Sequence, residues 1–264
     1  MRSQTNPFKA KMASGEVQHG LWLGLPDNSV AEIIASAGFD WLLIDAEHGP
    51  NDLRSILAQL QAVAPYHSQP VVRPPQGDQV LIKQLLETGI QSLLIPMVDT
   101  PEQARDLVSA MRYPPHGVRG VGSALARASR WGRVGTYMDE ADAEMCLLIQ
   151  AETRTAMENL DAILDVEGFD GVFFGAADLA ASYGYRGQSN HPHIVELILQ
   201  GLEKVKARGL AGGVLCTDKS LNAQFMQAGA NFVAVGVDAL LLAKATSELL
   251  ADYKGTESNV AGSY

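Results

Sequence analysis

Residues 41–50 read Trp-Leu-Leu-Ile-Asp-Ala-Glu-His-Gly-Pro, in which four large apolar side chains are followed directly by polar ones. A short, uninterrupted apolar run is typical of a strand that is buried on both faces. Asp45, Glu47 and His48 therefore lie where this strand leaves the core. His48 is suited to proton transfer because the pKa of histidine, about 6.5, is close to neutral pH. Asp45 is close enough in sequence to bind one ring nitrogen of His48, although a loop with solvated charges would give the same pattern.

Eight apolar runs of this kind recur along the chain, with helical patterns between them. They lie at residues 21–25, 41–45, 70–73, 92–96, 146–150, 171–174, 212–215 and 232–235. Eight alternations of strand and helix imply parallel pairing with right-handed crossovers, so the sequence predicts a (β/α)₈ barrel, the TIM-barrel fold. A doubly wound open sheet is the alternative, but no G-x-G-x-x-G pattern follows the first run.

Capping signals predict where the helices begin. Ser29 and Glu32 have the spacing of a capping box, Asp78 precedes a helical pattern, and Thr100 precedes a proline suited to the first helical position. Further helices are predicted at residues 51–64, 154–164, 191–208, 219–227 and 238–253. One connection, residues 113–143, is too long for a plain barrel loop, and we expect it to cross one barrel mouth.

The composition suits a single domain over residues 1–264, with a small, polar tail from about residue 255 that we expect to be disordered. The net charge of −10 argues against a nucleic-acid partner, which would require clustered positive charge. The first 18 residues lack the apolar core of a signal peptide, and no apolar run approaches the roughly 20 residues that span a bilayer. We therefore expect a cytoplasmic protein without a membrane partner, in which Cys146 and Cys216 are buried thiols.

Polar side chains follow the predicted strands at their carboxyl ends, where the chemistry of such barrels gathers. Glu152 and Asp178, from neighbouring strands, are candidate ligands of a hard divalent cation such as Mg²⁺ or Mn²⁺, unless they bind backbone amides or arginines instead. Arg73 offers a planar fork for a carboxylate or an enolate oxygen. A buried ion pair of Arg73 with Asp45 or Glu47 is the alternative.

The positions of the lysines argue against a Schiff-base aldolase, since none of the eight lies in a predicted strand. Cleavage of a carbon–carbon bond next to a keto group would then depend on a metal ion. Phosphate binding is not expected either, because the loops after the seventh and eighth strands carry Asp218 and Asp238 in place of a glycine-rich pattern.

Several stretches resemble the class II, metal-dependent pyruvate aldolases. They are residues 42–48, 70–73, 150–153 and 175–179, with residues 112–115, 119–124 and 232–238 in addition. The resemblance extends over about residues 6–253. It implies a single barrel that reversibly cleaves a 4-hydroxy-2-oxo acid into pyruvate and an aldehyde.

Within the family, the resemblance is greatest to members that cleave 4-hydroxy-2-oxoheptanedioate to pyruvate and succinic semialdehyde, in the aromatic catabolism of homoprotocatechuate. Trp22, Leu215 and Val237 match positions that line the aldehyde pocket, and they favour an apolar aldehyde. The alternative is an aldolase for sugar-derived 2-keto-3-deoxy acids, with a more polar pocket. A non-catalytic 2-oxo-acid binding protein is a further alternative from a different class.

The resemblance also implies a role for the polar residues. Glu152 and Asp178 would hold the metal, for which Mg²⁺, Mn²⁺, Co²⁺ or Zn²⁺ could serve, and pyruvate would chelate it through keto and carboxylate oxygens. The amides of Ala177 and Asp178 would hold the carboxylate, and Arg73 would bind the keto oxygen.

His48, paired with Asp45, would be the base that acts through an activated water, and Gln150 would line the same site. Members of the family are hexamers. We therefore expect a homohexamer, a trimer of dimers, in which the helix at residues 238–253 is exchanged with a neighbouring subunit.

Three features depart from the family pattern or stay open. Residues 175–178 read Gly-Ala-Ala-Asp where G-P-x-D is usual, so the anion-binding loop would be less rigid. Glu87 stands where related enzymes often carry an aspartate that reaches a neighbour's site. The distal carboxylate of the seven-carbon substrate would meet Arg119 or Arg127 from the long connection.

Overall fold

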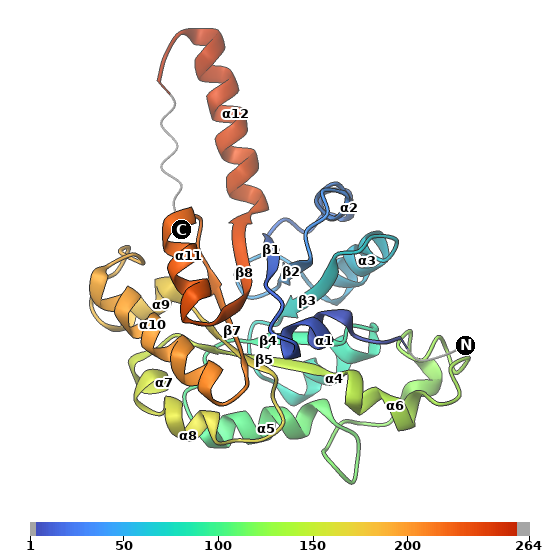
Figure 1. Cartoon of the computed structure of the whole chain (residues 1–264). Coiled ribbons are helices and arrows are strands. Elements are labelled where there is room, and N and C mark those ends of the chain that lie inside the picture. The colour runs from blue at the N-terminus through green and yellow to red at the C-terminus, as the bar shows by residue number, and fades with distance from the viewer. Residues whose placement is uncertain (1–3, 258–264) are drawn as a thin grey trace.

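The computed structural model describes residues 4–257, in which eight strands form one closed parallel barrel in chain order (Figure 1). The strands are β1 Gln18–Leu23, β2 Trp41–Asp45, β3 Gln69–Arg73, β4 Ser92–Ile95, β5 Cys146–Ala151, β6 Gly171–Phe174, β7 Ala211–Leu215 and β8 Ala230–Val237. β1 pairs in parallel with both β2 and β8, which closes the sheet. The predicted (β/α)₈ barrel is confirmed, and the open-sheet alternative is excluded.

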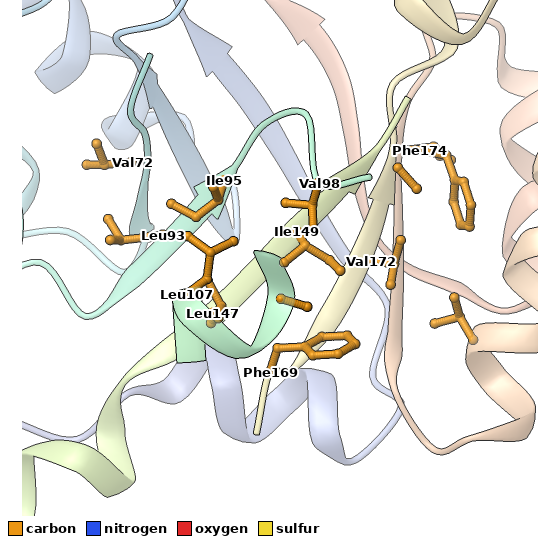
Figure 2. Packing of buried hydrophobic residues seen from close by; sticks show 14 of the residues in the cluster. Val72, Leu93, Ile95, Val98, Leu107, Leu147, Ile149, Phe169, Val172 and Phe174 are labelled. Carbon is orange, nitrogen blue, oxygen red and sulfur yellow. The ribbon is translucent and has the colours of Figure 1, made fainter. Parts of the chain in front are cut away.

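Side chains alternate between an inner and an outer layer of the core, as the pleat of a strand requires. Along β2, Trp41 and Leu43 belong to the inner cluster inside the barrel, whereas Leu42 and Ile44 belong to the outer cluster under the helices. Figure 2 shows part of the outer cluster. Gly20 makes room for the ring of Trp41, since a Cβ there would lie 2.2 Å from the indole.

Helices alternate with the strands along the chain, and most of them lie around the barrel (Figure 1). They are α1 Pro7–Ala13, α2 Asn28–Ser36, α3 Leu53–Val63, α4 Gln79–Glu87, α5 Pro101–Met111, α6 Tyr137–Glu144, α7 Arg154–Glu158, α8 Leu160–Leu164, α9 Ala176–Ser182, α10 Pro192–Ala207, α11 Lys219–Ala228 and α12 Asp238–Lys254, with a 3₁₀ turn η1 at Ser123–Leu125. The predicted caps Asp78 and Thr100 are confirmed. Asp27, rather than Ser29, caps α2, because its carboxylate accepts from the first free amides of that helix. The helix predicted at residues 154–164 is divided at Asn159.

The long connection, residues 113–143, does not lie over the mouth where the polar residues gather. It packs beside the end of α4 and the turn before β4, where Arg127 donates a 2.7 Å hydrogen bond to the carbonyl of Thr88. Arg119 is almost fully buried, with its guanidinium 4.3 Å from the centre of the Tyr113 ring and 2.9 Å from the hydroxyl of Tyr137. Both arginines therefore fasten the connection itself.

The last helix, α12, extends away from the barrel (Figure 1). Most of its side chains are exposed, including the apolar Leu241, Leu242, Leu249 and Leu250. Within residues 4–257, no helix is long and apolar enough to cross a membrane. The tail predicted to be disordered falls mostly on residues 258–264, which lie outside the described part of the chain. Both cysteines are free and buried, as expected.

Candidate active site

The residues proposed for the site line one cavity of about 450 Å³, although they come from separate parts of the chain. They are Trp22, Asp45, His48, Arg73, Gln150, Glu152, Ala177, Asp178, Leu215 and Val237. Each lies at or just beyond the carboxyl end of its strand, where the parallel strands of a barrel converge. The cavity has the size of a small-molecule site.

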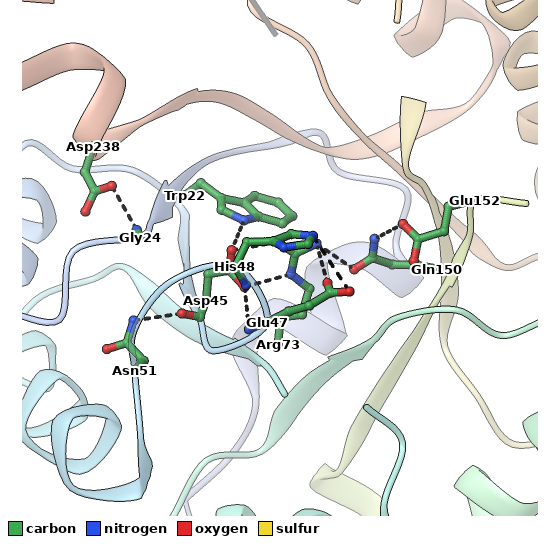
Figure 3. Close-up of polar contacts among 10 residues, drawn as sticks. All are labelled: Trp22, Gly24, Asp45, Glu47, His48, Asn51, Arg73, Gln150, Glu152 and Asp238. Atoms are coloured by element: carbon green, nitrogen blue, oxygen red, sulfur yellow. Dashed lines mark hydrogen bonds and ion pairs between the residues drawn. The ribbon is translucent and has the colours of Figure 1, made fainter. Parts of the chain in front are cut away.

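Arg73, at the end of β3, lies between two acidic side chains and an amide (Figure 3). Its Nε and Nη2 donate to the two carboxylate oxygens of Asp45 at 2.9 and 2.6 Å. Its Nη1 lies 2.9 Å from Oε2 of Glu47 and donates to Oε1 of Gln150 at 3.3 Å. Burial alone would raise the pKa of Asp45, but the hydrogen bonds and charge of Arg73 bring it below its ordinary value. The ion pair expected as an alternative is therefore present, and it fixes the direction of the guanidinium inside the cavity.

The expected pairing of Asp45 with the imidazole of His48 is wrong. Arg73 engages both oxygens of Asp45, which also accepts from the indole of Trp22 at 3.2 Å and from the backbone amides of Glu47 and His48 at 3.0 and 3.4 Å. The ring of His48 points elsewhere and its side chain is 64% exposed, with Nε2 3.8 Å from Oε1 of Glu47. Asp45 thus shapes the turn that carries His48.

Glu47 contacts the site more closely than the sequence suggested. Its carboxylate lies between Arg73 and His48 and is largely buried. Burial raises its pKa above the ordinary value, against the opposing charges of Arg73 and His48. Glu47, rather than Asp45, is therefore the carboxylate that faces the imidazole.

Glu152 lies at the floor of the cavity and is 1% exposed. Its Oε1 accepts from the amide of Met97 at 2.9 Å, and its Oε2 accepts from Nε2 of Gln150 at 2.6 Å. Its pKa is raised to about 7, mainly by burial; the negative charges of Glu47 and Asp178 act in the same direction, and the hydrogen bond from the Met97 amide opposes them. A nearby cation would stabilise the ionised form of this carboxylate.

Two backbone features shape this carboxylate's position. Met97 has a φ of 55°, in the left-handed region that costs a non-glycine residue about 1 kcal/mol, and its amide points at Glu152. A Cβ on Gly175 would lie 2.3 Å from Oε2 of Glu152, so only glycine leaves room there. Neither feature is visible in the sequence.

Glu152 and Asp178 fit a hard divalent cation, because both are carboxylates and their mutual repulsion would be relieved by it. Asp178 lies in the first turn of α9 and lines the same cavity. Among the described residues, no group of three or more His, Cys, Asp or Glu side chains is arranged for a metal. Water or substrate oxygens would therefore complete the coordination.

The other half of the cavity is mainly apolar. Trp22 lies against Phe173, with 5.3 Å between ring centres, and the guanidinium of Arg73 lies 5.0 Å from the Trp22 ring. The cavity is also lined by residues that no sequence motif indicated, namely Leu25, Phe173, Ser189, Asn190, Cys216, Phe225, Ala239 and Leu240. Ser189 and Asn190 stand out because they bring a hydroxyl and a carboxamide from the loop between α9 and α10.

Two earlier expectations concern residues outside this cavity. Arg119 and Arg127 do not line it, so neither meets a substrate held in the same chain. Arg127 and Glu87 line a separate hollow beside α4. Asp218 does not line the cavity either: its side chain accepts from the amides of Ser220 and Leu221 and caps α11.

A (β/α)₈ barrel with a carboxylate pair, an oriented guanidinium and an imidazole around one cavity has the features of an enzyme active site. Residues 18–245 match the family model described as HpcH/HpaI aldolase/citrate lyase. The chain belongs to this family, and it is a pyruvate aldolase, a carbon–carbon lyase.

Two relatives and one solved structure are similar to this chain over nearly its whole length. A hydroxypyruvate/pyruvate aldolase from Pseudomonas aeruginosa is 56% identical over 95% of this chain and 93% of the relative. A 2-keto-3-deoxy-L-rhamnonate aldolase from Klebsiella pneumoniae is 55% identical over 95% of this chain and 94% of the relative. The crystal structure of an HpcH/HpaI aldolase/citrate lyase family protein from Burkholderia cenocepacia superposes with a TM-score of 0.90 at 35% identity, covering 95% of this chain and 100% of that one. These names favour the sugar-acid alternative over cleavage of 4-hydroxy-2-oxoheptanedioate.

Proposed function

We propose that this protein is a metal-dependent aldolase that reversibly cleaves 2-keto-3-deoxy sugar acids into pyruvate and a short hydroxyaldehyde. The observation that carries the proposal is the shared cavity, which joins the carboxylate pair, Arg73 and His48 to a half that could receive the aldehyde. The relatives named for hydroxypyruvate and for a sugar-derived keto acid support the choice of substrate class. A non-catalytic binding protein is disfavoured by the same comparisons.

Glu152 and Asp178 would hold the divalent cation, with Mg²⁺ or Mn²⁺ as the best fit to two carboxylates, and with Co²⁺ or Zn²⁺ as alternatives. When bound, the cation would supply Lewis-acid stabilisation of the negative charge that develops when the carbon–carbon bond breaks.

The protein's own residues would divide the remaining tasks. Arg73, oriented by Asp45, would donate to the keto oxygen of the pyruvate unit, where charge accumulates in the enolate. The N-cap of α9, Gly175, offers no side-chain acceptor to the first amides of that helix. The amides of Ala177 and Asp178 would therefore bind the pyruvate carboxylate.

His48 would serve as the base for the hydroxyl group of the substrate, through an intervening water. Loss of the proton at the 4-hydroxyl lets the C3–C4 bond break, which releases the aldehyde and leaves pyruvate enolate to be protonated at C3. The exposed ring of His48, beside Glu47, can exchange that proton with solvent.

The charges and polar groups around the cavity favour a hydroxyaldehyde over a semialdehyde with a distal carboxylate. Among the lining residues that the structure describes, Arg73 is the one lysine or arginine, and it faces the pyruvate half. A second carboxylate would thus lack a cationic partner within this chain. Ser189 and Asn190 could instead bind hydroxyl groups.

The test is pyruvate release with and without EDTA, comparing kcat/KM for a 2-keto-3-deoxy sugar acid with that for 4-hydroxy-2-oxoheptanedioate. We expect EDTA to abolish turnover and the sugar acid to be preferred. Turnover that resists EDTA would refute the metal mechanism, and a preference for the dicarboxylate would refute the substrate class.

A pair of variants tests the polar residues of the aldehyde half. Ser189→Ala with Asn190→Ala should lower kcat/KM for the sugar acid about tenfold or more, while turnover of a 4-hydroxy-2-oxo acid with an alkyl tail stays within twofold. Gln188→Ala is the matched control, since Gln188 is exposed in the same loop and does not line the cavity. Equal losses on both substrates would remove the two residues from substrate recognition.

We further propose that the protein is a homohexamer in which α12 packs on a neighbouring copy. The support is the exposed apolar side chains of a helix that extends away from its own barrel (Figure 1). Leu242→Glu with Leu249→Glu should reduce the mass measured by light scattering. An unchanged mass would contradict this packing, and Lys244→Glu on the same helix is the control for added charge.

A further inference from the structure

Asp238 is a buried acidic residue that the proposed reaction does not use. It stands where β8 ends and α12 begins, and it is 4% exposed. Its carboxylate accepts from the amide of Gly24 at 2.8 Å (Figure 3). It also accepts from the amides of Leu25 at 3.0 Å and Ala239 at 2.6 Å. Over residues 4–257, no lysine or arginine forms an ion pair with it. Both oxygens are therefore committed to backbone amides.

The hydrogen bonds of Asp238 join two segments of the cavity wall. Gly24 and Leu25, which follow β1, line the cavity. Ala239 and Leu240, at the start of α12, line it as well. Hydrogen bonds between amides and an ionised carboxylate are stronger than those between neutral groups. Asp238 thus closes the barrel mouth at the junction of the first and last strands.

The same loop lies against the turn that carries His48. A Cβ on Gly49 would lie 2.7 Å from the carbonyl oxygen of Gly24 and 2.5 Å from that of Asp45. Gly49 therefore tolerates no side chain, because the backbone of the β1–α2 loop packs directly onto it. Gly24 is thus held by Asp238 through its amide and packs on Gly49 through its carbonyl.

We propose that Asp238 is a positioning residue for the aldolase reaction: by holding Gly24 and Leu25 it sets the position of the His48–Gly49 turn relative to the substrate. Asp238 touches no reacting atom in this scheme, and it acts through the backbone contact between Gly24 and Gly49. The inference rests on the proposed function, since it assigns the positioning of the base in that same site.

The experiment measures kcat and KM for Asp238→Ala and Asp238→Asn in the full-length protein loaded with Mg²⁺ or Mn²⁺. We expect kcat for cleavage to fall about 10- to 100-fold, as displacement of a catalytic group by about 1 Å can cause. The KM for pyruvate in the aldol direction should stay within threefold, because Arg73, Glu152 and Asp178 would bind pyruvate on the other wall. Asp238→Asn preserves volume but places an NH₂ group against one amide, so it tests the idea even if Asp238→Ala fails to fold.

Two further measurements separate positioning from a merely structural role. Gly49→Ala should slow cleavage in the same way, and the double variant with Asp238→Asn should be no slower than the slower single variant, because both disturb one contact. Asp218→Ala is the matched control: it removes a carboxylate that caps α11 through two backbone amides, and it should leave kcat within twofold.

The outcomes are distinguishable from failure of the proposed function. If the wild-type protein releases no pyruvate from any 4-hydroxy-2-oxo acid, the proposed function is refuted. If the wild-type protein is active, the inference is overturned by wild-type kcat in both Asp238 variants, by equal losses in Asp218→Ala, or by losses that multiply in the double variant with Gly49→Ala.

Discussion

Replacement of Glu152 by glutamine should remove two properties at once: the binding of the divalent cation and a pH dependence of stability in the metal-free protein. Burial raises the pKa of Glu152 to about 7 from an ordinary value of 4.5. Between these values the folded protein holds a proton that the unfolded chain has released. The stability of the metal-free protein therefore falls as the pH rises from about 4.5 to about 7, and it is constant above that range.

The magnitude follows from the same two pKa values. The interval from 4.5 to about 7 corresponds to about 3 kcal/mol of unfolding free energy at 1.36 kcal/mol for each pH unit. For a chain of this size, that is roughly 6–12 °C in the melting temperature. Glutamine keeps the shape and the acceptor for the Met97 amide, but it is uncharged at every pH. The melting temperature of Glu152→Gln should therefore change less over this range than that of the wild-type protein, by about the same 6–12 °C.

The assay is thermal unfolding in EDTA from pH 4.5 to 8, repeated with Mg²⁺ or Mn²⁺. In the wild-type protein the cation should restore most of the lost stability near pH 8, since it favours the ionised carboxylate. Glu152→Gln should show no such gain, and its pyruvate release should fall about 100-fold or more. A variant with the wild-type pH dependence, or one still stabilised by the cation, would refute the assignment of Glu152 to the metal.

Three further substitutions probe the same network. Arg73→Lys should lower kcat/KM about 100-fold, because lysine cannot donate to both oxygens of Asp45 while it faces the substrate; a loss under threefold would contradict this. Gly175→Ala should weaken cation binding about tenfold or more in calorimetry, because its Cβ would lie 2.3 Å from the Glu152 carboxylate; wild-type affinity would contradict the steric reasoning. Glu47→Gln should reduce the pH dependence of metal-free stability, since the charge of Glu47 raises the pKa of Glu152; an unchanged dependence would exclude that coupling.

The barrel could be predicted because its strands are buried on both faces and stand out as short apolar runs. The runs at residues 41–45 and 171–174 coincide with β2 and β6. Helix α9 was missed because it has seven residues, begins after a glycine without a side-chain cap, and consists largely of small residues. The capping box expected at Ser29 was wrong for a different reason. Asp27, two residues earlier, provides the carboxylate that caps α2.

The site could be predicted as a set of residues, but not as a set of contacts. Asp45 and His48 are neighbours in sequence, yet Asp45 turns to Arg73, which lies 28 residues further along the chain. The direction of a side chain depends on which partner reaches it, and the barrel decides this by placing β3 beside β2. Ser189 and Asn190 follow no strand directly, so the rule that identified the other residues could not identify them.

In the proposed function, the chemistry and the choice of aldehyde depend on different parts of the cavity. Arg73 and Glu152 are buried at the ends of β3 and β5 and are joined through hydrogen bonds to Gln150. The aldehyde half is formed instead by loops, by the start of α12 and by partly exposed side chains such as Ser189. Substitutions there can change the aldehyde without disturbing the buried network. Under the proposed function, such a division is consistent with relatives that are 56% and 55% identical to this chain, carry different substrate names and are both named aldolases. It also explains why the motifs of this sequence indicate the reaction more firmly than the substrate.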